Sequence, residues 1–143
     1  MSELAALLQE GRRRELEQSR FYRLLSGDAE RAGNAGVAER LNDLLADEQH
    51  HVSRLTARLL ELGAKPDGGR VDVGPVPGLD AWEREARRRE EREVEWYESA
   101  LSRVEDPDTA ALLRGILASE RHHEEHLSGK WMPAGPTTSE EGA

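Results

Sequence analysis

The sequence carries the same two-part pattern twice, and this repeat limits how the chain can fold more than any other feature. The first part is RRRE followed by a tyrosine seven residues after its Glu; it occurs at 12–15 before Tyr22 and at 87–90 before Tyr97. The second part is LADEQHH at 45–51 and LASERHH at 117–123. Because the match spans both parts of each half, it predicts two helical hairpins related by a pseudo-two-fold axis.

Apolar spacing and turn residues predict two long helices in each half. We expect helices over about 2–31, 37–62, 80–104 and 107–129, with a break at 33–36 and a Gly- and Pro-rich linker over 66–79. Asp80 is expected to cap the third helix, with Glu83 completing a capping box, and Pro107 suits the first position of the fourth. Short turns inside the pairs and one long connection between them are typical of an all-α four-helix bundle with one crossover linker.

Length and composition exclude several classes of protein. The chain has 143 residues, which suits one domain; we place it at 1–131 and expect the polar tail at 132–143 to be disordered. The formal charge of -9 argues against nucleic acid and anionic membranes as partners. The sequence has no cysteine, which excludes disulfides, thiolate zinc sites and cysteine-held iron sites. No stretch reaches membrane-spanning length, so we expect a soluble, cytoplasmic protein.

Ionisable side chains interrupt the apolar stripes of all four predicted helices. Two helices carry Glu-x-x-His on the stripe, at 48–51 and 120–123, and the other two carry one Glu on it. An unpaired carboxylate in a core costs several kcal/mol, and clustered carboxylates repel one another. Two divalent cations remove both penalties, and an oxygen-rich site with two imidazoles suits iron or manganese. The pattern therefore predicts a two-metal site at mid-bundle formed by Glu15, Glu48, His51, Glu90, Glu120 and His123.

With these motifs, the chain resembles the rubrerythrin-like branch of the ferritin-like superfamily over about 10–130. The resemblance implies a ferritin-like four-helix bundle with two iron ions, or manganese, that react with hydrogen peroxide or dioxygen. Peroxidase, ferroxidase and oxygenase activities all occur on this fold. Rubrerythrins proper also carry a rubredoxin domain with four cysteines, and this chain has none. The resemblance therefore implies a separate electron donor. The matching motifs are Glu15…Tyr22, Glu48-x-x-His51, Glu90-x-x-Glu93…Tyr97 and Glu120-x-x-His123.

The resemblance also implies roles for residues around the six ligands. Glu93 would be a seventh ligand, binding the iron that His123 binds in the reduced state; otherwise it is a surface Glu, and the other half has Gln18 at this position. Asp47 would orient a ligand histidine on another helix. Tyr22 and Tyr97 either donate hydrogen bonds to ligand carboxylates or are core aromatics.

Two further groups of charged residues are expected on the surface. The arginines of the two RRRE segments are expected to pair with nearby Glu residues on solvated faces. His50 and His122 lie about 100° from the ligand face and are expected to be exposed.

Three functions stay open from the sequence. The first is a di-iron peroxidase or oxidase, and the second is a ferroxidase that stores or detoxifies iron. The third is a metal-free structural bundle. Bacterioferritins share the six ligands but add a fifth helix that helps to build a cage, and the tail after Met132 is too short and polar for one. The oligomeric state also stays open, although bundles of this size often form homodimers.

Overall fold

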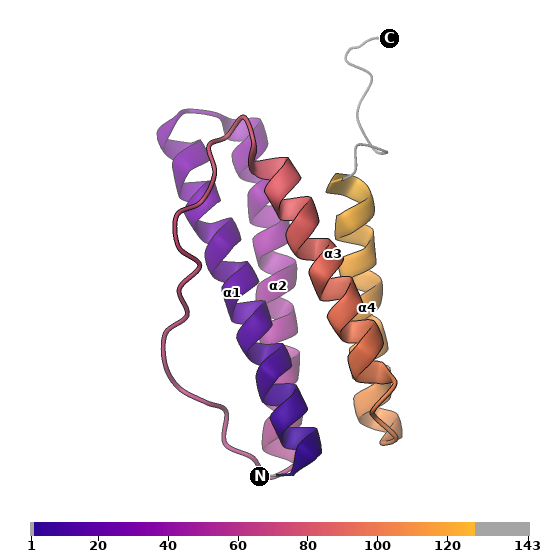
Figure 1. Cartoon of the computed structure of the whole chain (residues 1–143). Coiled ribbons are helices and arrows are strands. Elements are labelled where there is room, and N and C mark those ends of the chain that lie inside the picture. Colours follow the sequence, from indigo (N-terminus) through magenta and orange to yellow (C-terminus); the bar gives the residue numbers. More distant parts are fainter. Residues whose placement is uncertain (1, 128–143) are drawn as a thin grey trace.

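The computed structural model describes residues 2–127, which form four helices and no strand. These helices are α1 (Glu3–Arg31), α2 (Ala35–Glu61), α3 (Trp82–Leu101) and α4 (Pro107–Leu127). Figure 1 shows two hairpins side by side, α1 with α2 and α3 with α4, joined by one long connection that runs the length of the bundle beside α1. The predicted all-α bundle with one crossover is confirmed. The predicted end of the fourth helix near 129 and the tail at 132–143 lie outside the described residues.

The helices begin at side-chain caps where the sequence supplies them. The Ser2 hydroxyl accepts a hydrogen bond from the backbone N–H of Ala5 at 3.0 Å, and the Asn34 side chain accepts one from Val37 at 3.2 Å. Asn34 thus starts α2 two residues earlier than the glycine pattern indicated. The preceding turn contains Gly33 with φ 72°, a left-handed conformation that glycine adopts without strain.

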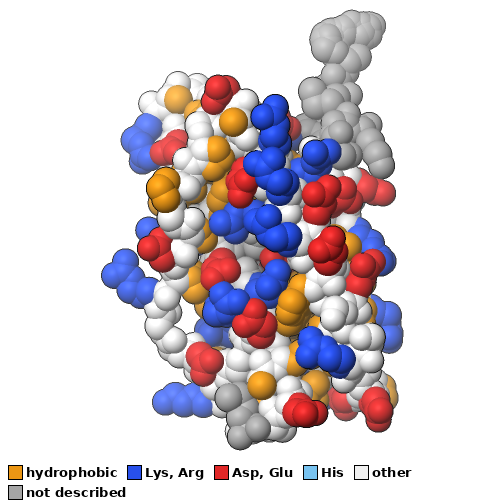
Figure 2. Space-filling view, viewed as in Figure 1, with side chains coloured by type: hydrophobic (Ala, Val, Ile, Leu, Met, Phe, Trp, Pro, Cys, Tyr) orange, Lys and Arg blue, Asp and Glu red, His pale blue; other side chains and the backbone are white. Residues whose placement is uncertain are grey.

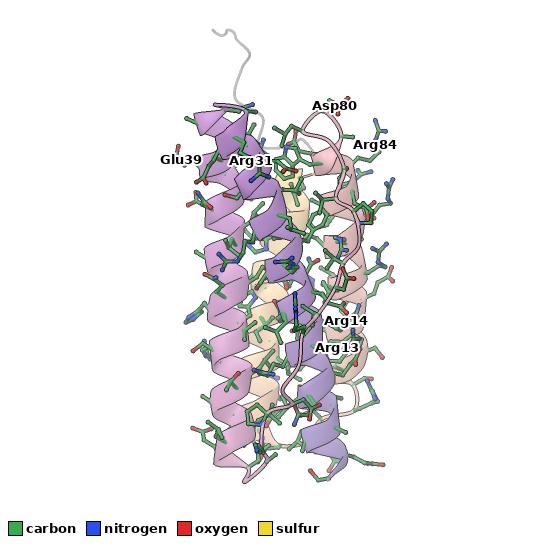
Figure 3. The ribbon with its side chains drawn as sticks, turned by 90° about the vertical axis from the view of Figure 1, so that its left-hand side faces the viewer. Arg13, Arg14, Arg31, Glu39, Asp80 and Arg84 are labelled. Atoms are coloured by element: carbon green, nitrogen blue, oxygen red, sulfur yellow. The ribbon has the colours of Figure 1, made fainter. Side chains whose placement is uncertain are left out.

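The predicted capping box at the start of α3 is wrong. Asp80 lies in the turn before the helix (Figure 3), and Ala81 occupies the cap position without any side-chain hydrogen bond. Glu83 bonds instead to Arg40 of α2 at 2.8 Å, an interaction between hairpins that sequence spacing could not reveal. The helix also ends at Leu101, three residues before the predicted Val104.

Polar side chains of α1 hold the crossover linker. The Gln9 amide donates to the Lys65 carbonyl at 2.8 Å, and its oxygen accepts from the Asp67 N–H at 3.0 Å. Arg12 donates to the Asp67 carbonyl at 2.9 Å. Further along, three linker residues pack on the core: Val73, Val76 and Leu79. The connection is therefore attached to the bundle at both of its ends.

The apolar core is divided into two clusters, one at each end of the bundle. One cluster contains Leu8 of α1 and Leu59 of α2, and the other contains Leu25 and Leu41 from the opposite ends of the same helices. The helix segments between the clusters bury charged side chains, as the interrupted stripes indicate. Of the helices in residues 2–127, we find none with the length and apolar character needed to cross a bilayer.

The two halves also resemble each other where α1 and α3 pack closely, with a small residue on one helix and an aromatic ring on the other. A Cβ at Gly11 of α1 would lie 3.2 Å from the ring of Trp96 on α3, and Gly11 is buried. The repeat counterparts of these two residues are Ala86 and Phe21, which lie together in the second core cluster. In one half the larger Trp ring packs against glycine, and in the other half the smaller Phe ring lies in the same cluster as alanine.

We expect Gly11→Ala to destabilise the fold by about 1 kcal/mol, because overpacking of about 1–3 kcal/mol exceeds the gain in helix propensity. Adding Trp96→Phe copies the other half and should recover part of the loss. Urea unfolding of the two single variants and the double variant measures the coupling. Strictly additive effects would show that the two positions do not constrain each other.

Candidate metal centre

Six of the predicted site residues meet between the two apolar clusters. All six residues are buried, and none is more than 5 % exposed. Their ligand atoms form two groups in which every atom lies within 4.8 Å of the others. One group is Glu15, Glu48, His51 and Glu120, and the other is Glu48, Glu90, Glu120 and His123.

Glu48 and Glu120 belong to both groups. Each comes from the Glu-x-x-His motif of its helix, α2 or α4, at equivalent positions of the repeat. The other two ligand positions of each group are occupied by one Glu and one His. Two cations bound here would share the Glu48 and Glu120 carboxylates, as in two-metal sites built from bundle helices.

Both histidines direct Nδ1 toward the carboxylates. Nδ1 of His51 lies 3.0 Å from Glu48 and 3.2 Å from Glu15, and Nδ1 of His123 lies 3.1 Å from Glu120. Nε2 of His123 faces the other way and contacts Asp47 of α2 at 2.8 Å. Asp47 therefore orients a histidine of another helix, the geometry that the resemblance implied.

The contact between Asp47 and His123 shifts the pKa of both side chains. The hydrogen bond to His123 lowers the pKa of Asp47. Burial opposes a positive charge on His123, but hydrogen bonds to Asp47 and Glu90 outweigh it and raise the pKa of His123 to about 9. Ser119, the repeat counterpart of Asp47, makes no such bond to His51 in the described part of the chain.

Each buried tyrosine bonds to a carboxylate of the other hairpin. The Tyr22 hydroxyl of α1 donates to Glu90 of α3 at 2.6 Å, and the Tyr97 hydroxyl of α3 donates to Glu15 of α1 at 2.6 Å. Burial, reinforced by the charge of the bonded Glu, raises the pKa of both tyrosines well above the usual value. Both hydroxyls therefore keep their protons and act as donors.

The four buried carboxyl groups of the site resist being ionised together. Burial, together with neighbouring carboxylates, raises the pKa of Glu48 and of Glu120 well above the usual value. Burial acts on Glu15 in the same direction, but its hydrogen bond and charge interaction with His51 lower its pKa. One oxygen each of Glu48, Glu90 and Glu120 has no hydrogen-bond partner among the described residues. Buried carboxylate oxygens without a hydrogen bond, beside two imidazole nitrogens, are a donor set that fits divalent iron or manganese.

Glu93, the seventh predicted ligand, lies outside both groups. It is 7 % exposed, which excludes the surface alternative, and its two oxygens accept from Arg14 of α1 at 3.1 Å each. Its repeat counterpart Gln18 donates to Glu90. Because the repeat counterpart of Glu90 is Glu15, the pseudo-symmetry places Glu93 near Glu15. His123 belongs to the group of Glu90, so the expected exchange of Glu93 with His123 on one iron stays a prediction.

Arginines of both triplets pair with nearby Glu residues as expected, but two of these arginines also make contacts between helices that were not expected. Arg13 pairs with Glu10 and Glu17 on the solvated face of α1 (Figure 3 labels Arg13 and Arg14 near the middle of the helix). Its neighbour Arg14 lies 3.6 Å from Glu10 but also pairs with the buried Glu93 at 3.1 Å. Arg89 of α3 likewise packs over the Phe21 ring at 4.3 Å instead of pairing only with Glu residues. The helical position of an arginine gives its direction, but not which partner its long side chain reaches.

The face formed by α1 and α3 shows how the remaining charges are distributed. Figure 2 shows basic and acidic side chains interspersed there, with only small hydrophobic patches. His50 and His122 are exposed, as predicted. Among the described residues, the exposed large hydrophobic side chains are Leu60 and Leu62 of the α2 C-terminal end.

A family model described as rubrerythrin matches residues 6–129. The chain belongs to the rubrerythrin family. Among solved structures, it is similar to the bacterioferritin BfrA of Mycobacterium tuberculosis, with a TM-score of 0.84 and 22% sequence identity over 91% of this chain and 84% of that one. At that identity the likeness shows the ferritin-like four-helix fold. A comparison with curated protein sequences found no match.

Family membership and the buried clusters together are consistent with iron binding in this rubrerythrin-family chain. We expect Tyr22→Phe and Tyr97→Phe each to weaken divalent metal binding by about tenfold, because a ligand carboxylate loses the donor that orients it. Calorimetric titration with Mn²⁺ measures both affinities. The pseudo-symmetry predicts similar losses for the two variants. Wild-type affinity in both would make these tyrosines core aromatics only.

Proposed function

We propose that this rubrerythrin-family chain is an oxidoreductase that holds two iron ions and reacts them with hydrogen peroxide or dioxygen. One ion would be held by Glu15 and His51, and the other by Glu90 and His123. Glu48 and Glu120 would be shared between the two ions. The single observation that carries the proposal is this sharing of two buried carboxylates by two four-residue groups. Manganese fits the same donors.

The surrounding residues support a reactive centre and not only a structural one. When bound, the two ions would supply electrons to peroxide or dioxygen. The hydroxyl oxygens of Tyr22 and Tyr97 donate to Glu90 and Glu15 over 2.6 Å. Asp47 fixes the ring of His123. The two apolar clusters exclude water from both ends of the site. An external electron donor would be needed for turnover.

A second candidate function is ferroxidase activity coupled to iron storage or detoxification. The observation that favours it is the structural likeness to a bacterioferritin. Both functions use the same two-ion site, and they differ in what happens after the first oxidation. A peroxidase returns to the reduced state when electrons arrive, whereas a storage protein continues to take up iron.

Oxidation after anaerobic loading with Fe(II) separates the candidates. Two equivalents per chain are added, followed by peroxide or dioxygen in separate samples, and then by a small-molecule reductant. Repeated cycles of peroxide consumption with constant bound iron support the oxidoreductase. Continued uptake of further Fe(II), many ions per chain, supports storage. Glu48→Gln serves as the control, because it removes a carboxylate shared by both groups. A wild-type chain that binds no iron contradicts both functions.

A further inference from the structure

Arg14 makes a set of contacts that holds one acidic side chain at the edge of the centre. Its guanidinium donates two parallel hydrogen bonds to the Glu93 carboxylate, each 3.1 Å long. The same guanidinium packs 5.4 Å from the centroid of the Trp96 ring. Trp96 is in turn confined by Gly11, where a Cβ would already be crowded. A two-pronged bond and a stacked ring fix the arginine more firmly than a single surface ion pair.

The other half of the repeat carries the equivalent contact with one chemical difference. Arg89 donates to the Gln18 amide oxygen at 3.2 Å and stacks on Phe21. The Gln18 amide nitrogen then donates to Glu90, a ligand carboxylate, at 3.3 Å. Gln18 therefore bridges its arginine and the metal centre, because an amide carries both a donor and an acceptor.

Glu93 cannot form such a bridge while it is ionised. A carboxylate only accepts hydrogen bonds, so it cannot donate to Glu15 as Gln18 donates to Glu90. The anion is attracted by Arg14 and repelled by the carboxylates of the centre, unless cations occupy that centre.

We propose that Arg14 is a positioning residue that keeps the Glu93 carboxylate off the metal centre, so that Glu93 becomes a ligand of the ion beside Glu15 only on leaving the guanidinium. This proposal rests on the proposed two-metal function. Arg14 and the cation compete for one carboxylate. The half with Gln18 has no such competition, so the two ions would differ in how readily they gain a ligand.

Metal affinity in a double-mutant cycle tests the competition. The probe is Co²⁺ added to the metal-free full chain, followed by calorimetry and by its visible spectrum. Arg14→Met should raise the affinity for one of the two ions by about tenfold, the factor that a charge-assisted hydrogen bond represents, and should change the Co²⁺ spectrum. In Glu93→Gln, adding Arg14→Met should leave only the small gain expected from removing a nearby positive charge.

Two control variants separate competition from charge and from folding. Arg89→Met removes the equivalent charge from the other half and should not add a ligand to the spectrum. Arg14→Lys keeps the charge but loses the two-pronged geometry, so it should give an intermediate gain even if the methionine variant folds poorly. Equal gains with and without Glu93 would overturn the proposal. A wild-type chain that binds no Co²⁺ would overturn the proposed function and this proposal with it.

Discussion

Removing metal from the loaded protein should lower its melting temperature by about 15 °C. Each ion binds the folded state alone, so two sites at a hundred times their dissociation constants add about 5 kcal/mol of stability. One kcal/mol corresponds to roughly 3 °C for a chain of this length. Thermal unfolding followed by circular dichroism, with and without a chelator, measures the difference. An unchanged melting curve in a sample shown to have bound metal would contradict this expectation.

Glu48→Gln should raise the melting temperature of the metal-free protein, although it lowers that of the protein supplied with metal. The variant loses a shared ligand and with it the stabilisation by metal. Its metal-free form should nevertheless melt above the metal-free wild type, because an amide of the same size replaces a buried carboxyl whose pKa is well raised. Glu91→Gln, at an exposed position of α3, is the matched control and should change neither property. A metal-free Glu48→Gln protein that melts below the wild type would argue against the unfavourable burial of charge.

The metal-free protein should become less stable as the pH rises from about 5 to 9. A carboxyl with a raised pKa keeps its proton in the folded state after the unfolded chain has lost it. The contribution of such a carboxyl to the free energy of unfolding is complete at low pH, and it is lost as the pH rises through the raised pKa. Glu48, Glu93 and Glu120 all act in this direction. His123, with a pKa raised to about 9, extends the loss to the alkaline end of the window.

One part of this pH effect can be assigned to Glu93. The pKa of Glu93 rises from 4.5 to about 7, which corresponds to about 3 kcal/mol lost across that interval. Glu15 has a lowered pKa, so its contribution is lost below pH 4.5, outside the window. Urea unfolding of metal-free protein at pH 5.5, 7 and 8.5 measures the slope. Glu93→Gln should make the slope shallower by the Glu93 share, mainly between pH 5.5 and 7, while Glu48, Glu120 and His123 keep the rest. A stability that increases with pH in the wild type would show that these carboxyls are not held as described.

Most of the fold and of the candidate site could be predicted from side chains that recur at helical spacing. A Glu and a His three residues apart on an apolar stripe can only point into the core, and two such stripes related by a repeat define opposing walls of one site. Glu48, His51, Glu120 and His123 therefore follow from spacing, and Tyr22 and Tyr97 from their shared face with Glu15 and Glu90. Their role in binding metal stays a prediction.

What sequence spacing missed depends on the reach of side chains between elements. Arg14 and Arg13 are neighbours of the same type and both pair with Glu10, yet only Arg14 also bonds to a buried carboxylate, that of Glu93. The two side chains leave α1 about 100° apart. Which carboxylate Arg14 reaches depends on how α1 packs against α3, and no local pattern encodes that packing. The failed cap at Asp80 has the same origin, because Glu83 reaches α2 rather than its own helix end. The unequal residues Gln18 and Glu93 at equivalent repeat positions were the signal that could have drawn attention to Arg14.

The stoichiometry of anaerobic Fe(II) binding tests the central claim most directly. Iron(II) is titrated into the metal-free chain, and bound ions per folded chain are counted by native mass spectrometry. The two groups that share Glu48 and Glu120 predict saturation at about two ions per chain in the wild type. Glu48→Gln should bind fewer ions, and more weakly. A wild-type chain that binds none, or a Glu48→Gln chain that still binds two with unchanged affinity, would contradict the account.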